Sequence, residues 1–219
     1  IGDLTRIVCA AIDENSKTTK IKKLESYPDY EIDNDRLNFS CNLNLNSKPI
    51  EIIRIFRIAQ KTGLDIHPAA LRKITQNIAL IDQKFCAEKQ ANDLFLNILS
   101  DRNDAYIILR RMNEAGVLER FIPEFRKAIA LMQFDRYHVF TVDEHTLHAI
   151  DIAHKIENGD LRDICSLPSA LIHEIQNRRI LFVALLLHDL CKGRGGNHEQ
   201  LGAELALKVC PRLGLNDAE

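Results

Sequence analysis

Apolar residues recur along most of the chain at the spacing of amphipathic helices. One helix is predicted to begin at Pro49, which suits the first helical position, and to end at Gly63, which suits a C-cap. Its apolar stripe consists of Ile52, Ile53, Phe56 and Ala59. The same spacing predicts helices over residues 4–11, 68–81, 85–99 and 105–112. The pattern therefore predicts an all-α, mainly helical fold.

A different pattern, in which apolar and polar residues alternate, occupies residues 30–45. The apolar positions are Tyr30, Ile32, Leu37, Phe39, Cys41, Leu43 and Leu45. A period of two is typical of strands, and Asn34-Asp35 suits a tight turn between them. We expect one small β-hairpin near residues 30–45 and no other strand region. The polar stretch 13–23, which contains several lysines, is predicted to be a solvated loop.

Length and composition limit the classes of protein that remain. With 219 residues and 46% hydrophobic content, the chain can fill one large or two small cores. A formal net charge of -2 gives no overall field, so we expect neither nucleic acid nor an anionic membrane as partner. No apolar run approaches the roughly 20 residues of a membrane span. The six cysteines form no C-x-x-C pair, which is typical of reduced thiols in a cytoplasmic protein.

The chain divides near Pro123 into two predicted units. Residues 1–122 are expected to form a scaffold. In residues 123–219 a helix over 124–134 leads into a segment that holds seven of the eight histidines, from His138 to His198. Because the sequence opens without Met, in a pattern that is already helical, we expect it to be a piece of a longer protein.

The dipeptide His188-Asp189 directly follows the apolar run 180–187. A helix that is apolar on every side is a buried helix, so both residues are expected at or near the core, with Lys192-Gly193 closing the helix. A buried unpaired carboxylate costs several kcal/mol, and a divalent cation held by imidazole and carboxylate together removes that cost. An ion pair would remove it as well. The candidate cations for such a pair are Lys192, Arg178, Arg179 and Arg194.

Three neighbouring features favour the metal. The string Thr141 to Glu144 has the form of a capping box, which places His145 in the first turn of a helix. The loop 193–197 holds three glycines, so a ligand can approach its backbone closely. His198 follows Asn197, a predicted N-cap, and can point back toward the dipeptide. The predicted metal ligands are His145, His188, Asp189 and His198.

The other histidines and two basic residues receive weaker assignments. His148, one turn after His145, is a rival ligand, and His138 precedes the helix. His67 is expected to be a turn residue, and His154 and His173 are expected on the surface. Lys192 and Arg194 can offer charge to a phosphate.

Longer strings around these residues resemble one family of enzymes. His145, His188-Asp189 and His198 resemble the HD superfamily of metal-dependent phosphohydrolases. The strings 111–118, 137–146 and 188–198 are similar to the bifunctional uridylyltransferase/uridylyl-removing enzymes that act on the PII nitrogen-signalling protein of bacteria. The resemblance implies an HD-domain-like helical bundle over 123–219. It also implies that residues 1–122 are the helical connector that follows a nucleotidyltransferase core, the core itself being absent here.

The resemblance further implies a reaction and its residues. The HD domain of this family removes UMP from a tyrosine of PII by hydrolysis, so uridylylated PII would be the partner and UMP the product. The cofactor would be a divalent metal, with Mn²⁺ or Mg²⁺ favoured because no cysteine joins the ligand set. His188, Asp189 and Lys192 would be catalytic, and Lys192 and Arg194 would bind the phosphate.

One departure from the family pattern and two alternatives accompany this interpretation. The family's final metal-binding Asp would lie beyond Glu219, and Asp217 matches neither its position nor its context, so the HD unit is expected to be truncated at its C-terminus. The string 51–68 also resembles the neck of tRNA nucleotidyltransferases that carry an HD domain. Alternatively, the chain could be a regulatory or docking module that does not catalyse a reaction.

Overall fold

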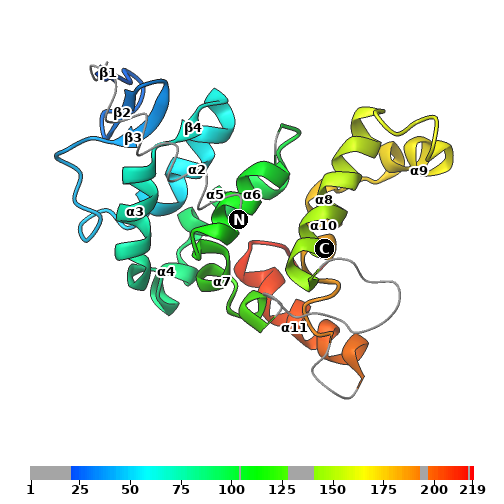
Figure 1. The fold of residues 1–219 in the computed structure, drawn as a ribbon. Coiled ribbons are helices and arrows are strands. Elements are labelled where there is room, and N and C mark those ends of the chain that lie inside the picture. The colour runs from blue at the N-terminus through cyan, green and yellow to red at the C-terminus, as the bar shows by residue number, and fades with distance from the viewer. Residues whose placement is uncertain (1–20, 104, 128–140, 193–196, 217) are drawn as a thin grey trace.

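The structure is a computed structural model that describes residues 21–103, 105–127, 141–192, 197–216 and 218–219. Within these residues the chain is mainly helical, as its sequence predicted (Figure 1). Several predictions fall outside the described residues. They concern the helix over 4–11, the greater part of the loop 13–23, His138, most of the glycine loop with Arg194, and Asp217.

Helix α2 (Glu51–Thr62) lies in the core of the first part, where its apolar residues are almost completely buried. This helix begins two residues after Pro49 and ends, as predicted, at Gly63, which adopts the left-handed conformation that favours glycine. The other helices of this part are α3 (Pro68–Gln76), η1 (Ile78–Leu80), α4 (Gln83–Ala87), α5 (Lys89–Leu99), α6 (Ala105–Glu114), α7 (Val117–Phe121) and η2 (Pro123–Lys127).

A small sheet lies beside these helices at one corner of the molecule (Figure 1). The predicted hairpin is formed by β2 (Tyr30–Asp33) and β3 (Arg36–Phe39), with Asn34 and Asp35 at positive φ in the turn. The prediction of a single strand region was wrong. Strand β1 (Ile21–Lys23) pairs antiparallel with β2, and β4 (Asp65–Ile66) pairs parallel with β3.

A buried hydrogen bond connects the sheet to α2. The hydroxyl of Tyr30 donates to the carboxylate of Glu51 across 2.6 Å. Burial raises the pKa of the Tyr30 hydroxyl, and the bond to Glu51 raises it further, so the hydroxyl remains a donor. The sheet is thereby fixed to the first turn of the central helix.

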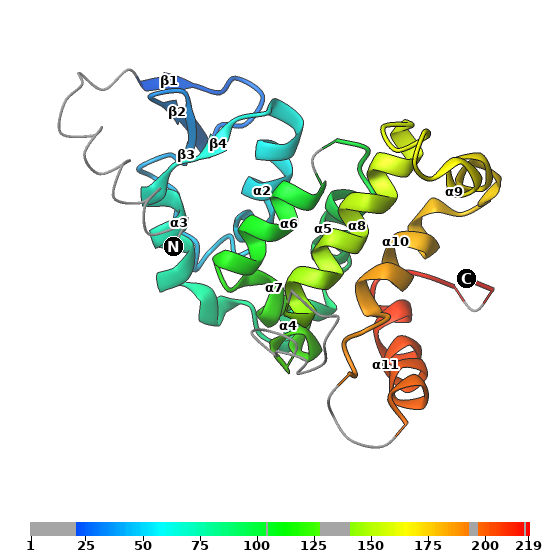
Figure 2. The ribbon, with the colours of Figure 1, turned by 45° about the vertical axis from the view of Figure 1, so that its right-hand side comes forward.

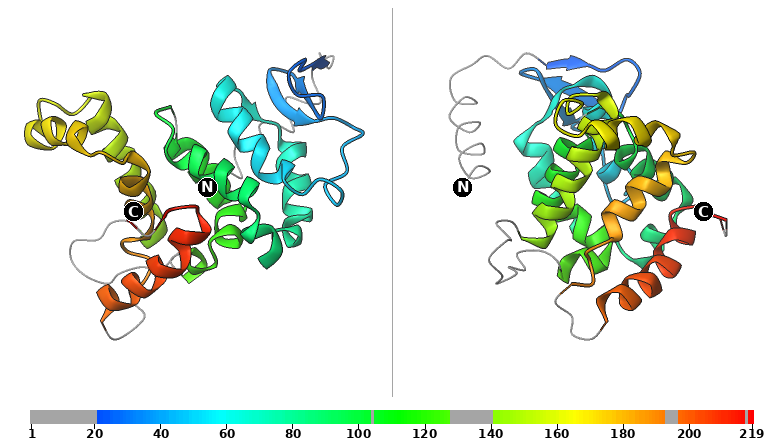
Figure 3. Two further views of the ribbon diagram at one scale, coloured as in Figure 1. Left: turned by 180° about the vertical axis from the view of Figure 1, so that it is seen from behind. Right: turned by 90° about the vertical axis from the view of Figure 1, so that its right-hand side faces the viewer.

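The second part packs against the first through α8 (Val142–Asn158) and α10 (Arg178–Leu187). Helix α8 lies against α6, and α10 lies against α5 and α8, so that these helices stand side by side (Figure 2). The remaining elements are α9 (Ser166–Leu171), η3 (Ile172–Glu174) and α11 (His198–Arg212), of which α9 stands away from the main body (Figure 3). One cluster of buried apolar residues runs through both parts.

Two sequence-based predictions for this part need correction. The helix expected over 124–134 is, in its described portion, the short 3₁₀ helix η2. His154, expected on the surface, is buried because its ring stacks on Phe182 of α10 with the ring centroids 4.2 Å apart. Among the described helices, none has both the length and the apolar character needed to cross a membrane.

Candidate metal centre

The first turn of α8 presents His145. Thr141 precedes the helix in an extended conformation, and its carbonyl accepts a hydrogen bond of 2.8 Å from the His145 amide. The predicted capping box is wrong in one respect, because the Thr141 side chain makes no capping hydrogen bond. Asp143 and Glu144 lie in the first turn, where their negative charges interact favourably with the positive, N-terminal end of the helix dipole.

His188 and Asp189 directly follow the last residue of α10, and they differ in burial. The side chain of Asp189 is 8% exposed, as predicted, but that of His188 is 37% exposed. The expectation that both lie in the core was therefore wrong for His188. The reason is that α10 buries only one face, through Phe182, Val183, Leu186 and Leu187, while Ala184 on the same turn is exposed.

A backbone contact fixes the proton on the His188 ring. Its Nδ1 lies 2.7 Å from the carbonyl oxygen of Leu185. A carbonyl can only accept a hydrogen bond, so Nδ1 carries the hydrogen, and in the neutral ring Nε2 has a free lone pair. This is the tautomer that a histidine needs in order to bind a metal through Nε2.

Both imidazoles point toward one oxygen of Asp189. His145 Nε2 lies 3.3 Å and His188 Nε2 lies 3.2 Å from Asp189 Oδ2. In the part of the chain that the structure describes, these three residues form the group of side chains that could hold a metal ion. The structure therefore brings together three of the four predicted ligands.

The spacing of these atoms fits a divalent ion. Ligand atoms about 2.1 Å from one metal lie roughly 3 to 3.4 Å apart when they occupy neighbouring positions of an octahedron or a tetrahedron. Moreover, the lone pair of a neutral His188 Nε2 would face the negative Asp189 oxygen, which is repulsive unless a cation lies between them. The donor set is therefore consistent with a bound metal.

Lys192 also approaches the same oxygen. Its Nζ lies 2.6 Å from Asp189 Oδ2, in an ion pair that the sequence offered as the alternative to a metal. Among the other candidate cations, Arg178 pairs with Glu157 and not with Asp189. Asp189 is thus neutralised by Lys192 and remains accessible to two imidazoles.

The remaining predicted residues lie apart from this group. Asn197 caps α11, as predicted, because its Oδ1 accepts from the Glu199 and Gln200 amides. His198, the first residue of α11, is exposed and does not belong to the group of three. The rival His148 stacks on Tyr106, with the ring centroids 5.2 Å apart, and is also outside the group.

Two protein-family models together match most of the described residues. The family "Uridylyltransferase GlnD third domain" matches residues 30–121, and the family "HD domain" matches residues 142–219. The chain is similar to a GlnD third domain followed by an HD domain. The candidate metal centre lies within the HD-domain match. The string 51–68, which also resembled tRNA nucleotidyltransferases, lies within the third-domain match.

Two curated relatives match the chain along its whole length. The chain is 49% identical to the bifunctional uridylyltransferase/uridylyl-removing enzyme of Azospirillum brasilense and 41% identical to that of Rhodospirillum rubrum. Both matches cover the entire chain and 24% of the relative. The chain thus spans about a quarter of the length of these curated relatives.

Two contributors to the site were not predicted from the sequence. The carbonyl of Leu185 orients His188, and its only signal is its position three residues earlier on the same helix. Glu157, at the far end of α8, holds Arg178, which sequence reasoning considered only as a partner of Asp189. No local pattern indicates a pairing between residues on two different helices.

Proposed function

We propose that this chain carries the uridylyl-removing centre of a bifunctional enzyme of bacterial nitrogen signalling. The reaction is hydrolysis of the phosphodiester between UMP and a tyrosine of the PII protein. The observation that carries the proposal is the convergence of His145 Nε2 and His188 Nε2 on the buried Asp189 carboxylate. Support also comes from the HD-domain match and from two relatives whose names include uridylyl removal.

A divalent ion would be held by His145, His188 and Asp189. Mn²⁺ and Mg²⁺ suit the nitrogen and carboxylate donors and the phosphodiester substrate, and no cysteine belongs to the described group. Such an ion supplies Lewis acidity, by which the pKa of a water falls and a phosphoryl oxygen is polarised.

The other side chains act on the substrate itself. Lys192 Nζ is close to Asp189 and its side chain is 26% exposed, so it can turn toward an incoming phosphate and stabilise negative charge on it. Arg194 is assigned to the same phosphate. His198 is assigned to a second ion or to the substrate phosphate. The catalytic set proposed is His188, Asp189 and Lys192.

The substrate of the proposed reaction is the uridylylated form of PII, and the product is UMP. Both belong to the cytoplasm, where we place the enzyme. Neither a membrane nor a nucleic acid is proposed as a partner, since the formal net charge of -2 provides no attraction to anionic surfaces.

The test is UMP release from uridylylated PII by the protein expressed from its complete gene. Release is measured with and without Mn²⁺ for wild type, His188→Ala and Asp189→Ala. We expect release to require Mn²⁺ and to fall at least about a hundredfold in both variants, because each loses a metal ligand. His173→Ala is the matched control, since His173 is exposed on η3.

The opposite pattern would favour a docking module. In that case His188→Ala and Asp189→Ala would leave UMP release intact and weaken binding of PII instead. The ion pair between Lys192 and Asp189 would then have a purely structural role.

A further inference from the structure

Helices α8 and α10 are joined at both ends. At one end His145, near the start of α8, meets Asp189, which follows α10. At the other end Glu157, in the last turn of α8, binds Arg178, the first residue of α10. The two helices therefore run antiparallel, with the candidate metal centre and the ion pair about 15 to 18 Å apart along their axes.

The ion pair between Arg178 and Glu157 is bidentate. Arg178 Nε donates to Glu157 Oε1 across 2.6 Å, and Arg178 Nη2 donates to Oε2 across 2.7 Å. The Glu157 side chain is only 9% exposed. Its burial favours a raised pKa, but hydrogen bonds and charge from Arg178 lower the pKa below its usual value, so the carboxylate stays ionised.

Local helix electrostatics do not explain this pair. Arg178 places a positive charge at the N-terminus of α10, and Glu157 places a negative charge at the C-terminus of α8. Each position is unfavourable to the helix dipole. The two charges compensate each other only while the helices stay in register, so the pair defines how α8 and α10 sit together.

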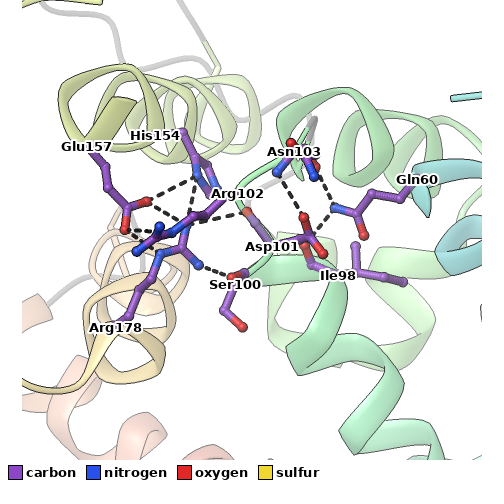
Figure 4. A network of polar contacts seen from close by, with 9 residues as sticks. All are labelled: Gln60, Ile98, Ser100, Asp101, Arg102, Asn103, His154, Glu157 and Arg178. Atoms are coloured by element: carbon purple, nitrogen blue, oxygen red, sulfur yellow. Dashed lines mark hydrogen bonds and ion pairs between the residues drawn. The ribbon is translucent and has the colours of Figure 1, made fainter. Parts of the chain in front are cut away.

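Arg178 also reaches the loop between α5 and α6 (Figure 4). Its Nη1 donates to the carbonyl of Ser100, and its Nη2 donates to the carbonyl of Asp101 across 3.3 Å. The same Nη2 lies 3.1 Å from His154 Nδ1. One guanidinium therefore connects α8, α10 and a loop that belongs to the third-domain match.

The loop is in turn fixed to the central helix α2. Arg57 binds the Asp101 carboxylate across 2.5 Å. Gln60, which is buried, donates to the carbonyl of Asn103 across 2.9 Å (Figure 4). A continuous set of polar contacts thus runs from the core of the third domain to the pair of helices that presents the metal ligands.

We propose that Arg178 is a positioning residue of the metal centre, through which the loop 100–103 sets the spacing between His145 and Asp189. The inference rests on the proposed function of that centre. Because the Arg178–Glu157 pair sets the register of α8 and α10 at the end far from the metal, its loss lets the packed helices shift slightly at the end that binds the metal. The third domain can therefore adjust the metal affinity of the HD domain without contacting the substrate.

The test compares Mn²⁺ affinity in wild type, Arg178→Met and Arg102→Met, in the protein expressed from its complete gene. Methionine keeps an unbranched apolar side chain at this position but removes the charge and the contact of the guanidinium with Phe182. Arg102 is a matched control, because it lies 3.7 Å from the same Glu157 carboxylate with its own side chain 72% exposed. We expect a loss of Mn²⁺ affinity of roughly tenfold in Arg178→Met and a change within about twofold in Arg102→Met.

A second readout separates positioning from general damage. UMP release by Arg178→Met should be low at limiting Mn²⁺ and should recover when Mn²⁺ is raised to saturation. If this variant does not fold, Glu157→Gln is measured in its place, with a smaller loss in the same direction expected.

Two results would overturn the inference. The first is a folded Arg178→Met, or Glu157→Gln if that variant is used, with a Mn²⁺ affinity within about twofold of wild type. This result would exclude the positioning role and would leave the metal centre unaffected. If instead wild type and His188→Ala bind Mn²⁺ equally well, the metal centre itself is wrong and the inference falls with it.

Discussion

His145 Nε2 lies 3.3 Å from Asp189 Oδ2, so the start of α8 and the residue pair that follows α10 meet at one carboxylate oxygen. The Nε2 atom of His188, the residue before Asp189, lies 3.2 Å from the same oxygen. The contact between Leu185 and His188 Nδ1 leaves Nε2 of the neutral ring ready to bind a cation. The arrangement makes the role of each neighbouring charge testable.

Replacement of Lys192 should separate metal binding from catalysis. Lys192 Nζ lies 2.6 Å from Asp189 and competes with a divalent ion for the carboxylate. We therefore expect Lys192→Met to bind Mn²⁺ about tenfold more tightly, because a neighbouring positive charge is gone. UMP release should nevertheless fall about a hundredfold, since a group that stabilises charge on the phosphate is lost.

Mn²⁺ titration and initial rates of UMP release check both halves of this prediction. Lys208→Met is the control, because it removes the same charge from an exposed position on α11. Unchanged release in Lys192→Met would show that Lys192 serves only as the ion-pair partner of Asp189.

The buried His154 should make the protein sensitive to acid. Burial, together with the positive charge of Arg178, lowers the pKa of His154 to about 4, while the negative charge of Glu157 opposes the shift. The unfolded chain, with a histidine pKa near 6.5, binds a proton that the folded chain excludes between these values. The free energy of unfolding therefore decreases, because of His154, as the pH falls from about 6.5 to about 4.

Urea denaturation at pH 7 and pH 5 measures this effect. Wild type should lose about 2 kcal/mol more than His154→Leu does between the two pH values. His173→Leu provides the comparison, because His173 is exposed and should leave the pH dependence of wild type unchanged. Equal losses in wild type and His154→Leu would mean that His154 is not held neutral by burial.

His198 distinguishes one metal ion from two. It is exposed at the start of α11 and stands outside the group formed by His145, His188 and Asp189. We expect His198→Ala to retain the first Mn²⁺ equivalent with affinity within about twofold of wild type. If His198 binds a second ion, the variant loses one equivalent, whereas a raised KM for uridylylated PII with unchanged stoichiometry indicates a contact with the phosphate.

Much of the fold could be predicted from periodicity. The hairpin around Asn34-Asp35 was confirmed, because both strands have alternating side chains and a turn that tolerates positive φ. The strands β1 and β4 were missed, since each is too short to show a pattern and β4 pairs with a strand distant in the sequence. His154 was misplaced for a similar reason, because its burial depends on Phe182.

The candidate site was predictable as far as residue types and helix positions allow. His145, His188 and Asp189 stood out because each belongs to a helix end with a recognisable pattern, and the structure brings them together. The exposure of His188 depends on which face of α10 meets the core. A run in which every residue is apolar does not indicate which face that is. The pairing of Arg178 with Glu157 is a tertiary contact and has no counterpart in local sequence.

The most direct test of the metal centre is a crystal of the protein soaked in Mn²⁺, with diffraction data collected at the manganese absorption edge. We expect an anomalous peak about 2.2 Å from His145 Nε2, from His188 Nε2 and from the Asp189 carboxylate, and no such peak in crystals of Asp189→Ala. A well-ordered site with Lys192 still bound to Asp189, and with the manganese peak elsewhere in the molecule, would contradict this expectation.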